Sequence, residues 1–327
     1  MKKLTHIGLV IGLLLFVGLL VWQGVLEVVN LLLSSGWELL WLPIVWLPSI
    51  FPTTESWRLC FHNDRKPKLY NSLVAMWIGR AVNNLLPVAT IGGEIIKARL
   101  ATLNGSGVKD ASASVMVDKT LQALALILWG LIGMGLLIFL SLDDGLAVYV
   151  FSGFLLLTAG VLGFMMVQKH GMFSLFAKLG GVVIKTEAWE GVSIGAREID
   201  TLVMDIYKNR TRFIIAVFYK TLGLILQTTE VWLACYLLGH PIGILEALML
   251  KSLTATISDI AFIIPNAYGI QEGAFIMIGA LLGFGPELAL ALSLAIRVRE
   301  VVIDVPGLIL WHQIESRHLL KRQSLGH

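Results

Sequence analysis

The chain consists of long apolar stretches separated by short polar segments. A helix needs about 20 mostly apolar residues to cross the hydrocarbon core of a bilayer. Six stretches reach that length, near residues 5–26, 37–57, 115–140, 146–167, 213–238 and 286–311. The pattern predicts an all-α polytopic integral membrane protein with about six full spans.

Two further apolar blocks, residues 69–104 and 243–283, are each interrupted near the middle by proline and glycine. Each block is too long for one crossing and has no polar loop that would separate two crossings. We therefore expect two re-entrant helical hairpins, which enter the membrane partway and return to the same side. The expected breaks are Pro87, Gly92 and Gly93 in the first hairpin, and Pro265 and Gly269 in the second.

The composition agrees with a membrane protein. The chain is 57% hydrophobic and 14% charged, whereas soluble domains carry roughly 25% charged residues. The net charge of +3 does not indicate a nucleic-acid partner. Cys60 and Cys235 form no cluster, so they suggest neither a disulfide framework nor a zinc site.

Several catalytic motifs are absent from the sequence. It has no G-x-x-x-x-G-K-[ST] phosphate loop, no H-E-x-x-H and no G-x-S-x-G, and its seven histidines are scattered. We therefore expect no ATP-driven or hydrolytic chemistry, no metal and no cofactor, and a protein that is not an enzyme.

The placement of basic residues predicts the orientation. If Lys2 and Lys3 are cytoplasmic, most of the 25 basic residues fall in cytoplasmic segments, as the positive-inside bias requires. No basic residue falls in the expected outside turns, near 27–36, 141–145, 239–243 and 284–287. Both termini are then cytoplasmic, and the first apolar stretch is a retained helix, because no cleavage site follows it.

This topology makes the two hairpins enter from opposite sides, which is the arrangement of an inverted-topology repeat. A proline precedes a glutamate by seven residues in each hairpin, at Pro87 and Glu94 and at Pro265 and Glu272. A serine then precedes a charged residue by four, at Ser114 and Asp118 and at Ser293 and Arg297. We expect a single membrane domain, 1–327, with a first repeat at 69–140 and a second at 243–312.

The polar segment at 168–212 separates the two repeats. It mixes aromatic and aliphatic residues with lysine and glutamate, which predicts short amphipathic helices on the cytoplasmic membrane surface. A plain solvated linker is the alternative interpretation.

The hairpin breaks have a chemical consequence. Irregular backbone at membrane depth has to line the protein interior or a cavity. A new half-helix begins after each break, near Gly93 and near Gly269, and its first amides carry the positive end of the helix dipole. Two such starts that meet inside the membrane would suit an anionic group.

Polar residues near the breaks and in the spans are the candidates for substrate binding, because charges in spans usually face an interior. The candidates are Arg80, Asn83, Asn84, Glu94, Asp118, Lys119, Glu272, Arg297, Arg299 and Glu300. Arg297, Glu300 and Asp304 share one helical face. The arginines suit a phosphate or a polyol, and Glu94 and Glu272 suit hydroxyls, an amine or a coupling proton.

A purely structural interpretation of these residues stays open. Glu94 would cap its half-helix and pair with Arg80, and Arg297 with Glu300 would be an i,i+3 pair within the bundle. Asn83 and Asn84 would satisfy backbone groups that the break leaves free.

Four segments carry a resemblance to a known family: "WIGRAVNNLLPVATIGGEIIKARLA", "SASVMVDKTLQ", "PNAYGIQEGAFIMIGALLG" and "LALSLAIRVREVVIDVPGLILW". They resemble the flippase-like membrane domain of the lysylphosphatidylglycerol synthase family, and are most similar to the stand-alone branch associated with bacterial hopanoid biosynthesis. The resemblance implies a lipid-handling protein of the bacterial inner membrane. In the two-domain synthases a separate soluble domain transfers the aminoacyl group, so we do not expect that chemistry here.

The leading hypothesis is therefore a flippase-like lipid translocase whose partners are a lipid substrate, the membrane and lipid-synthesis enzymes. A non-transporting scaffold for lipid-synthesis enzymes is the alternative, and it would have little need for interior arginine and glutamate. An enzyme that acts on an isoprenoid phosphate would need a nucleophile or an acidic metal site, and the sequence indicates neither.

Overall fold

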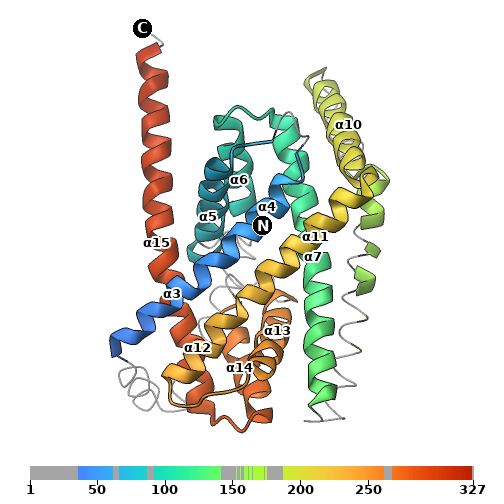
Figure 1. Cartoon of the computed structure of the whole chain (residues 1–327). Coiled ribbons are helices and arrows are strands. Elements are labelled where there is room, and N and C mark those ends of the chain that lie inside the picture. The colour runs from blue at the N-terminus through green and yellow to red at the C-terminus, as the bar shows by residue number, and fades with distance from the viewer. Residues whose placement is uncertain are drawn as a thin grey trace. The chain divides into compact units, whose positions relative to one another are not determined.

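The computed structural model describes residues 36–61, 66–86, 92–140, 187–260 and 267–325, together with parts of 152–174. All regular secondary structure in these residues is helical (Figure 1). The prediction of an all-α protein is confirmed for this part of the chain.

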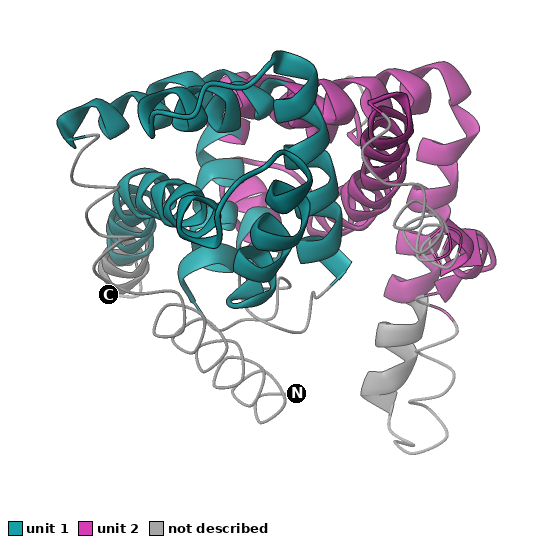
Figure 2. Ribbon diagram, turned by 90° about the horizontal axis from the view of Figure 1, so that it is seen from below, with its two compact units in different colours: residues 1–48, 73–97, 226–327 teal, residues 49–72, 98–225 magenta. Residues whose placement is uncertain are grey.

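The chain divides into two compact units, coloured teal and magenta in Figure 2. Unit 1 comprises residues 1–48, 73–97 and 226–327, and unit 2 comprises residues 49–72 and 98–225. Each unit combines segments that are far apart in the sequence. Helices α5 (Leu69–Leu85) and α6 (Gly92–Leu103) contain residues of both units.

Unit 2 is built around α7 (Val108–Phe139), a helix of 32 residues. Helices α4 (Ile50–Arg58) and α10 (Glu187–Lys208) both pack on α7. The Trp57 indole N–H donates to Ser114 Oγ (3.2 Å), which joins α4 to α7. Ser56 Oγ donates to the carbonyl of Ala216 (2.8 Å), which joins α4 to α11 (Arg210–Leu226).

Helix α10 occupies part of the polar segment for which short amphipathic helices were expected. It is one helix of 22 residues, with a buried stripe at helical spacing formed by Ala196, Asp200, Val203 and Tyr207. This stripe packs within unit 2: Tyr207 donates to Gln168 Oε1 (2.5 Å), and Asp200 accepts from Ser174 N (2.8 Å). Burial raises the pKa of Tyr207 to about 12, so the phenol remains the donor of this bond near neutral pH.

Unit 1 contains α3 (Trp41–Trp46), α12 (Thr228–Leu237), α13 (Ile244–Ile260), α14 (Ile270–Leu281) and α15 (Pro286–Leu325). Helix α12 packs on α3, α13 and α15, and α14 packs on α13 and α15. Short 3-10 helices, η1 (Gly36–Leu40) and η2 (Leu47–Ser49), flank α3.

The two interrupted apolar blocks form helix pairs of matching length. Helices α5 and α13 each have 17 residues, and α6 and α14 each have 12. At 1.5 Å per residue these helices are about 26 and about 18 Å long, short of the ~30 Å hydrocarbon core. The prolines expected at the breaks, Pro87 and Pro265, lie outside the described residues.

Glycine permits a close approach between α5 and α6. A Cβ atom on Gly79 would lie 2.9 Å from the carbonyl oxygen of Gly93, and one on Gly93 would overlap the carbonyl oxygen of Gly79. The amide N–H of Gly93 also donates to Asn83 Oδ1 (2.8 Å). The two backbones therefore touch where α6 begins, a contact that only glycine allows.

Two helical segments among the described residues are long and apolar enough to cross a membrane, α7 and Arg210–Leu237. They match the spans predicted at 115–140 and 213–238. The span predicted at 37–57 is divided into η1, α3, η2 and α4, in a segment that contains Pro43, Pro48 and Pro52. The span predicted at 286–311 lies within the 40-residue α15, while 5–26 and most of 146–167 lie outside the described residues.

Candidate functional site

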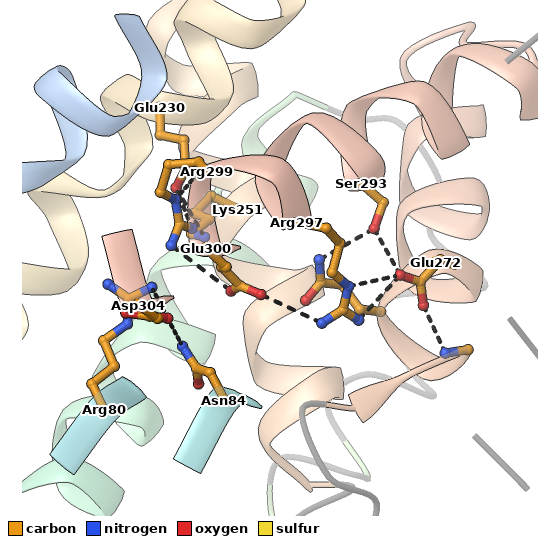
Figure 3. A network of polar contacts seen from close by, with 12 residues as sticks. Arg80, Asn84, Glu230, Lys251, Glu272, Ser293, Arg297, Arg299, Glu300 and Asp304 are labelled. Carbon is orange, nitrogen blue, oxygen red and sulfur yellow. Dashed lines mark hydrogen bonds and ion pairs between the residues drawn. The ribbon is translucent and has the colours of Figure 1, made fainter. Parts of the chain in front are cut away.

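Polar side chains line one face of α15 inside unit 1. Ser293, Arg297, Glu300 and Asp304 follow one another at intervals of four, three and four residues, which places them on one side of a helix. Ser293 and Asp304 are fully buried, and Arg297 is 8% exposed. With residues from four other helices they form the charge network of Figure 3, which comprises Arg80, Asn84, Glu230, Lys251, Glu272, Ser293, Arg297, Arg299, Glu300 and Asp304.

Glu272 joins the start of α14 to α15. Its Oε2 accepts from the backbone N–H of Gly269 (2.7 Å), the residue before the helix. Its Oε1 accepts from Ser293 Oγ, Arg297 Nε and Arg297 Nη2, all at 3.1 Å. Gly269 has φ +78°, a conformation that favours glycine. Both carboxylate oxygens thus accept hydrogen bonds, and two of the four donors belong to the Arg297 guanidinium, which makes these bonds charge-assisted.

Glu230 joins α12 to α15 in the same way. It is fully buried and binds the Arg299 guanidinium in a bidentate arrangement, with Arg299 Nε at 2.5 Å and Nη2 at 3.0 Å. Lys251 on α13 places its ammonium 3.8 Å from Glu230 Oε2. The arrangement is a fork-to-fork pair with a second cation beside it.

Glu300 connects these two groups. One carboxylate oxygen lies 3.5 Å from Arg297 Nη1, and the other lies 3.8 Å from Arg299 Nη1. The Glu272 and Glu230 ion pairs therefore belong to one network along α15 (Figure 3).

Arg80 and Asn84 on α5 meet α15 at Asp304. Asn84 Nδ2 donates to Asp304 Oδ2 (2.8 Å), and Arg80 Nη2 lies 3.6 Å from the same oxygen. The helices also meet at Trp77, whose indole N–H donates to the carbonyl of Ile303 (2.8 Å). This contact lies in the turn before Pro306, where the proline ring disturbs regular helical hydrogen bonding.

Aromatic rings cover three of the guanidinium groups. Arg80 lies 3.7 Å and Arg299 lies 4.9 Å from the ring centroid of Trp46 on α3. Arg297 lies 4.5 Å from the centroid of Tyr268. These cation–π contacts stabilise the positive charges away from bulk water.

The charges of the network balance. Its acidic members are Glu230, Glu272, Glu300 and Asp304, and its basic members are Arg80, Lys251, Arg297 and Arg299. Buried charges are tolerated when they are paired and hydrogen-bonded. In the part of the chain that the structure describes, no three His, Cys, Asp or Glu side chains are grouped to hold a metal ion.

The network includes more than half of the binding candidates proposed from the sequence, namely Arg80, Asn84, Glu272, Arg297, Arg299 and Glu300. Two other candidates lie where α5 meets the start of α6, Asn83 on α5 and Glu94 on α6. Asn83 accepts from the Gly93 amide, and Glu94 forms an ion pair with Lys97 (2.7 Å). Arg80, which the structural interpretation paired with Glu94, forms its ion pair with Asp304 instead.

The remaining candidates, Asp118 and Lys119, belong to unit 2. Asp118 forms a buried ion pair with Lys220 of α11 (2.5 Å), and Lys119 Nζ donates to Gln122 Oε1 (3.1 Å). Ser114, the other landmark of the first repeat, accepts from Trp57 and donates to the carbonyl of Ala111.

The candidates did not include Glu230, Lys251 or Asp304. The sequence could have indicated each of them as a candidate. Glu230 and Lys251 are charges within apolar segments, and Asp304 shares a helical face with Arg297. The two aromatic partners, Trp46 and Tyr268, carried no such signal, because aromatic residues are frequent throughout the apolar stretches.

Comparison with known proteins identifies the family. The profile described as the lysylphosphatidylglycerol synthase TM region matches residues 9–306. No curated protein and no solved structure matches the chain. The matched region covers every helix of the charge network except the end of α15 beyond residue 306. The chain therefore belongs to the lysylphosphatidylglycerol synthase TM region family and is a membrane protein related to lipid metabolism or transport.

Proposed function

We propose that this protein is a flippase-like lipid translocase that binds a polar lipid headgroup at the charge network while the apolar tails stay in the bilayer. The observation that carries this proposal is the network itself, in which eight charged side chains from five helices lie together in one unit and none is more than 20% exposed.

The energetics of burial support a functional reason for these charges. A charged residue in the middle of a membrane helix costs about 2.5–3.5 kcal/mol on insertion scales. Well-packed apolar residues often hold a buried interface as well as, or better than, a buried ion pair. A polar path for a headgroup explains why α15 keeps Arg297, Arg299 and Glu300.

The helix pairs support the proposal from a second direction. Helices α5 and α6 have the lengths of α13 and α14, and a long helix follows each pair. Inverted repeats with interrupted helices are typical of transporters, whose sites lie at the half-helix starts. Glu272 and Glu94 each lie in the first turn of a 12-residue helix. We infer that the two pairs are the re-entrant hairpins of such a repeat.

The proposed location is the bacterial inner membrane, and the proposed substrate is a phospholipid- or hopanoid-related lipid. The resemblance to the hopanoid-associated branch motivates the second lipid class. A scaffold for lipid-synthesis enzymes remains the alternative function, and it predicts that the network charges can be neutralised without loss of function.

Reconstitution tests the proposal. We expect liposomes that contain the protein to exchange fluorescent lipids between leaflets faster than protein-free liposomes, measured as the fraction quenched by an impermeant reductant. Glu300→Gln should slow the exchange, because its contacts of 3.5 and 3.8 Å connect the two halves of the network.

Lys208→Gln is the control, because Lys208 is 70% exposed on α10 and forms a local i,i+3 ion pair with Asp205. Equal exchange with and without protein, for anionic, aminoacylated and hopanoid lipids, would count against transport. Unchanged exchange by Glu300→Gln would favour a site elsewhere in the chain.

A further inference from the structure

The four carboxylates of the charge network differ in how fully they are paired. Glu272 and Glu230 each have both oxygens bound by donors. Asp304 is also fully buried, but Asn84 and Arg80 both approach its Oδ2. Its Oδ1 is buried and has no hydrogen-bond partner among the described residues.

An unpaired donor lies on the neighbouring cation. Arg80 Nη2 faces Asp304, whereas Arg80 Nη1 is buried and has no hydrogen-bond partner in the described part of the chain. The guanidinium carbon lies over the Trp46 ring, 3.7 Å from its centroid, and this cation–π contact holds the group beside Asp304. A buried polar atom without a partner is costly, which makes each such atom a place where a ligand gains affinity.

We propose that Arg80 and Asp304 form a subsite for a hydroxyl group of a neutral, polyhydroxylated headgroup. One hydroxyl both donates and accepts. It would donate to Asp304 Oδ1 and accept from Arg80 Nη1, and both unpaired atoms would be satisfied at once. The subsite rests on the proposed function, since it names the class of headgroup that the network recognises.

The charge balance favours a neutral group over an ion. The four acids and four bases already compensate one another. A phosphate at Arg80 would compete with Asp304 and leave a buried carboxylate without its cation, and an ammonium at Asp304 would do the same to Arg80. A hydroxyl adds no charge and leaves the Arg80–Asp304 pair intact.

Accessibility indicates the direction of approach. The Arg80 side chain is 20% exposed, whereas the Asp304 side chain is fully buried. A headgroup therefore approaches from the side of the arginine, and contact with the two buried atoms, Arg80 Nη1 and Asp304 Oδ1, requires α5 and α15 to separate locally. Such an opening step is expected of a protein that alternates between bound and free states.

Binding to the wild-type protein gives the first test and needs no variant. Native mass spectrometry of the purified full chain would compare glucosyl-diacylglycerol, its O-methylated analogue, phosphatidic acid, phosphatidylethanolamine and phosphatidylcholine. We expect the hydroxylated glycolipid to bind about tenfold more tightly than the methylated one, because a hydrogen bond to a charged group is lost. Equal binding of these two lipids, or strongest binding of phosphatidylethanolamine, would overturn the proposal.

Asp304→Asn gives the second test. It should weaken glucosyl-diacylglycerol binding and strengthen phosphatidic acid binding, because the Arg80 charge is then uncompensated. Asp200→Asn is the control, since Asp200 is also a buried aspartate that accepts hydrogen bonds but lies on α10 in unit 2. A variant that is only destabilised would bind both lipids more weakly. Asp304→Asn therefore contradicts the subsite if its affinity for the two lipids is unchanged or changes in the same direction.

Two further measurements distinguish a lipid headgroup from a soluble polyol as the ligand, and the subsite proposal from the translocase proposal. Competition by free glucose at the same concentration as the glycolipid would support hydroxyl recognition and assign it to a soluble polyol, whereas no competition supports a lipid headgroup. Leaflet exchange that is unaffected by Asp304→Asn would overturn the subsite and leave the translocase standing. Glycolipid binding without any exchange would overturn the translocase and leave the subsite standing.

Discussion

At the scale of single residues, the number of hydrogen-bond donors at each carboxylate separates the side chains that stabilise the fold from those that can still bind a ligand. Glu272 receives four donors and Glu230 receives a bidentate arginine. The sequence predicted interior charges such as Arg297, because a charge in a span is costly. It also predicted the Arg297–Glu300 pair within one helix, which the structure contains. It could not predict the pairs between helices, because these join residues up to 224 positions apart, as in Arg80 with Asp304.

Glu272→Gln should lower the free energy of unfolding in detergent by about 3–5 kcal/mol, because Arg297 loses the carboxylate that accepts two of its N–H groups and keeps the longer contact with Glu300 (3.5 Å). Chemical denaturation followed by far-UV circular dichroism measures this loss. The double variant Glu272→Gln with Arg297→Met should recover part of it, since both charges are then removed. A single variant as stable as the wild type would mean that the pair contributes little to the fold.

At the scale of helices, proline and glycine patterns predicted where the chain is interrupted. The blocks 69–104 and 243–283 form pairs of short helices, as their central breaks indicated. The stretch 37–57 has the length of a span, but it forms several short helices. Its three prolines indicated that the helix would be interrupted. The prediction of a full span relied on apolar length alone and did not take them into account. The docking of α10 on α7 depends on contacts between distant residues, which a single sequence does not reveal.

Gly93→Ala should destabilise the protein by about 1–3 kcal/mol or more, because its Cβ would overlap the backbone carbonyl of Gly79. Thermal unfolding of the purified protein in detergent measures the change. Gly135→Ala on α7 is the control, since no other atom lies within 4 Å of the added Cβ. It should be neutral or stabilise by about 0.5–1 kcal/mol, because alanine is the better helix former. Equal effects of the two substitutions would contradict the close approach of α5 and α6.

At the scale of the whole molecule, charge placement along the sequence predicts an orientation that awaits measurement. The 168–212 segment should be cytoplasmic, and the turn near 239–243 should face the opposite side, because basic residues are concentrated in the former and absent from the latter. Cys60 and Cys235 are both buried, so an introduced cysteine can be labelled against a low background.

His240→Cys should react with an impermeant maleimide on intact spheroplasts, whereas Lys208→Cys should react only after the membrane is opened. Both positions are exposed, so access is limited only by the membrane. Labelling is measured by the mass shift on a denaturing gel. The reverse pattern would invert the predicted topology, and labelling of both residues on intact spheroplasts would place them on the same side.

The position of Trp46 links three helices of unit 1. Its single indole ring contacts the guanidinium groups of Arg80 on α5 and Arg299 on α15. Any displacement of α3 therefore removes the aromatic cover from both cations together, and any ligand that draws one arginine away alters the surroundings of the other. By reciprocity, the free energy of moving α3 depends on occupancy at Arg80 as strongly as occupancy there depends on the position of α3.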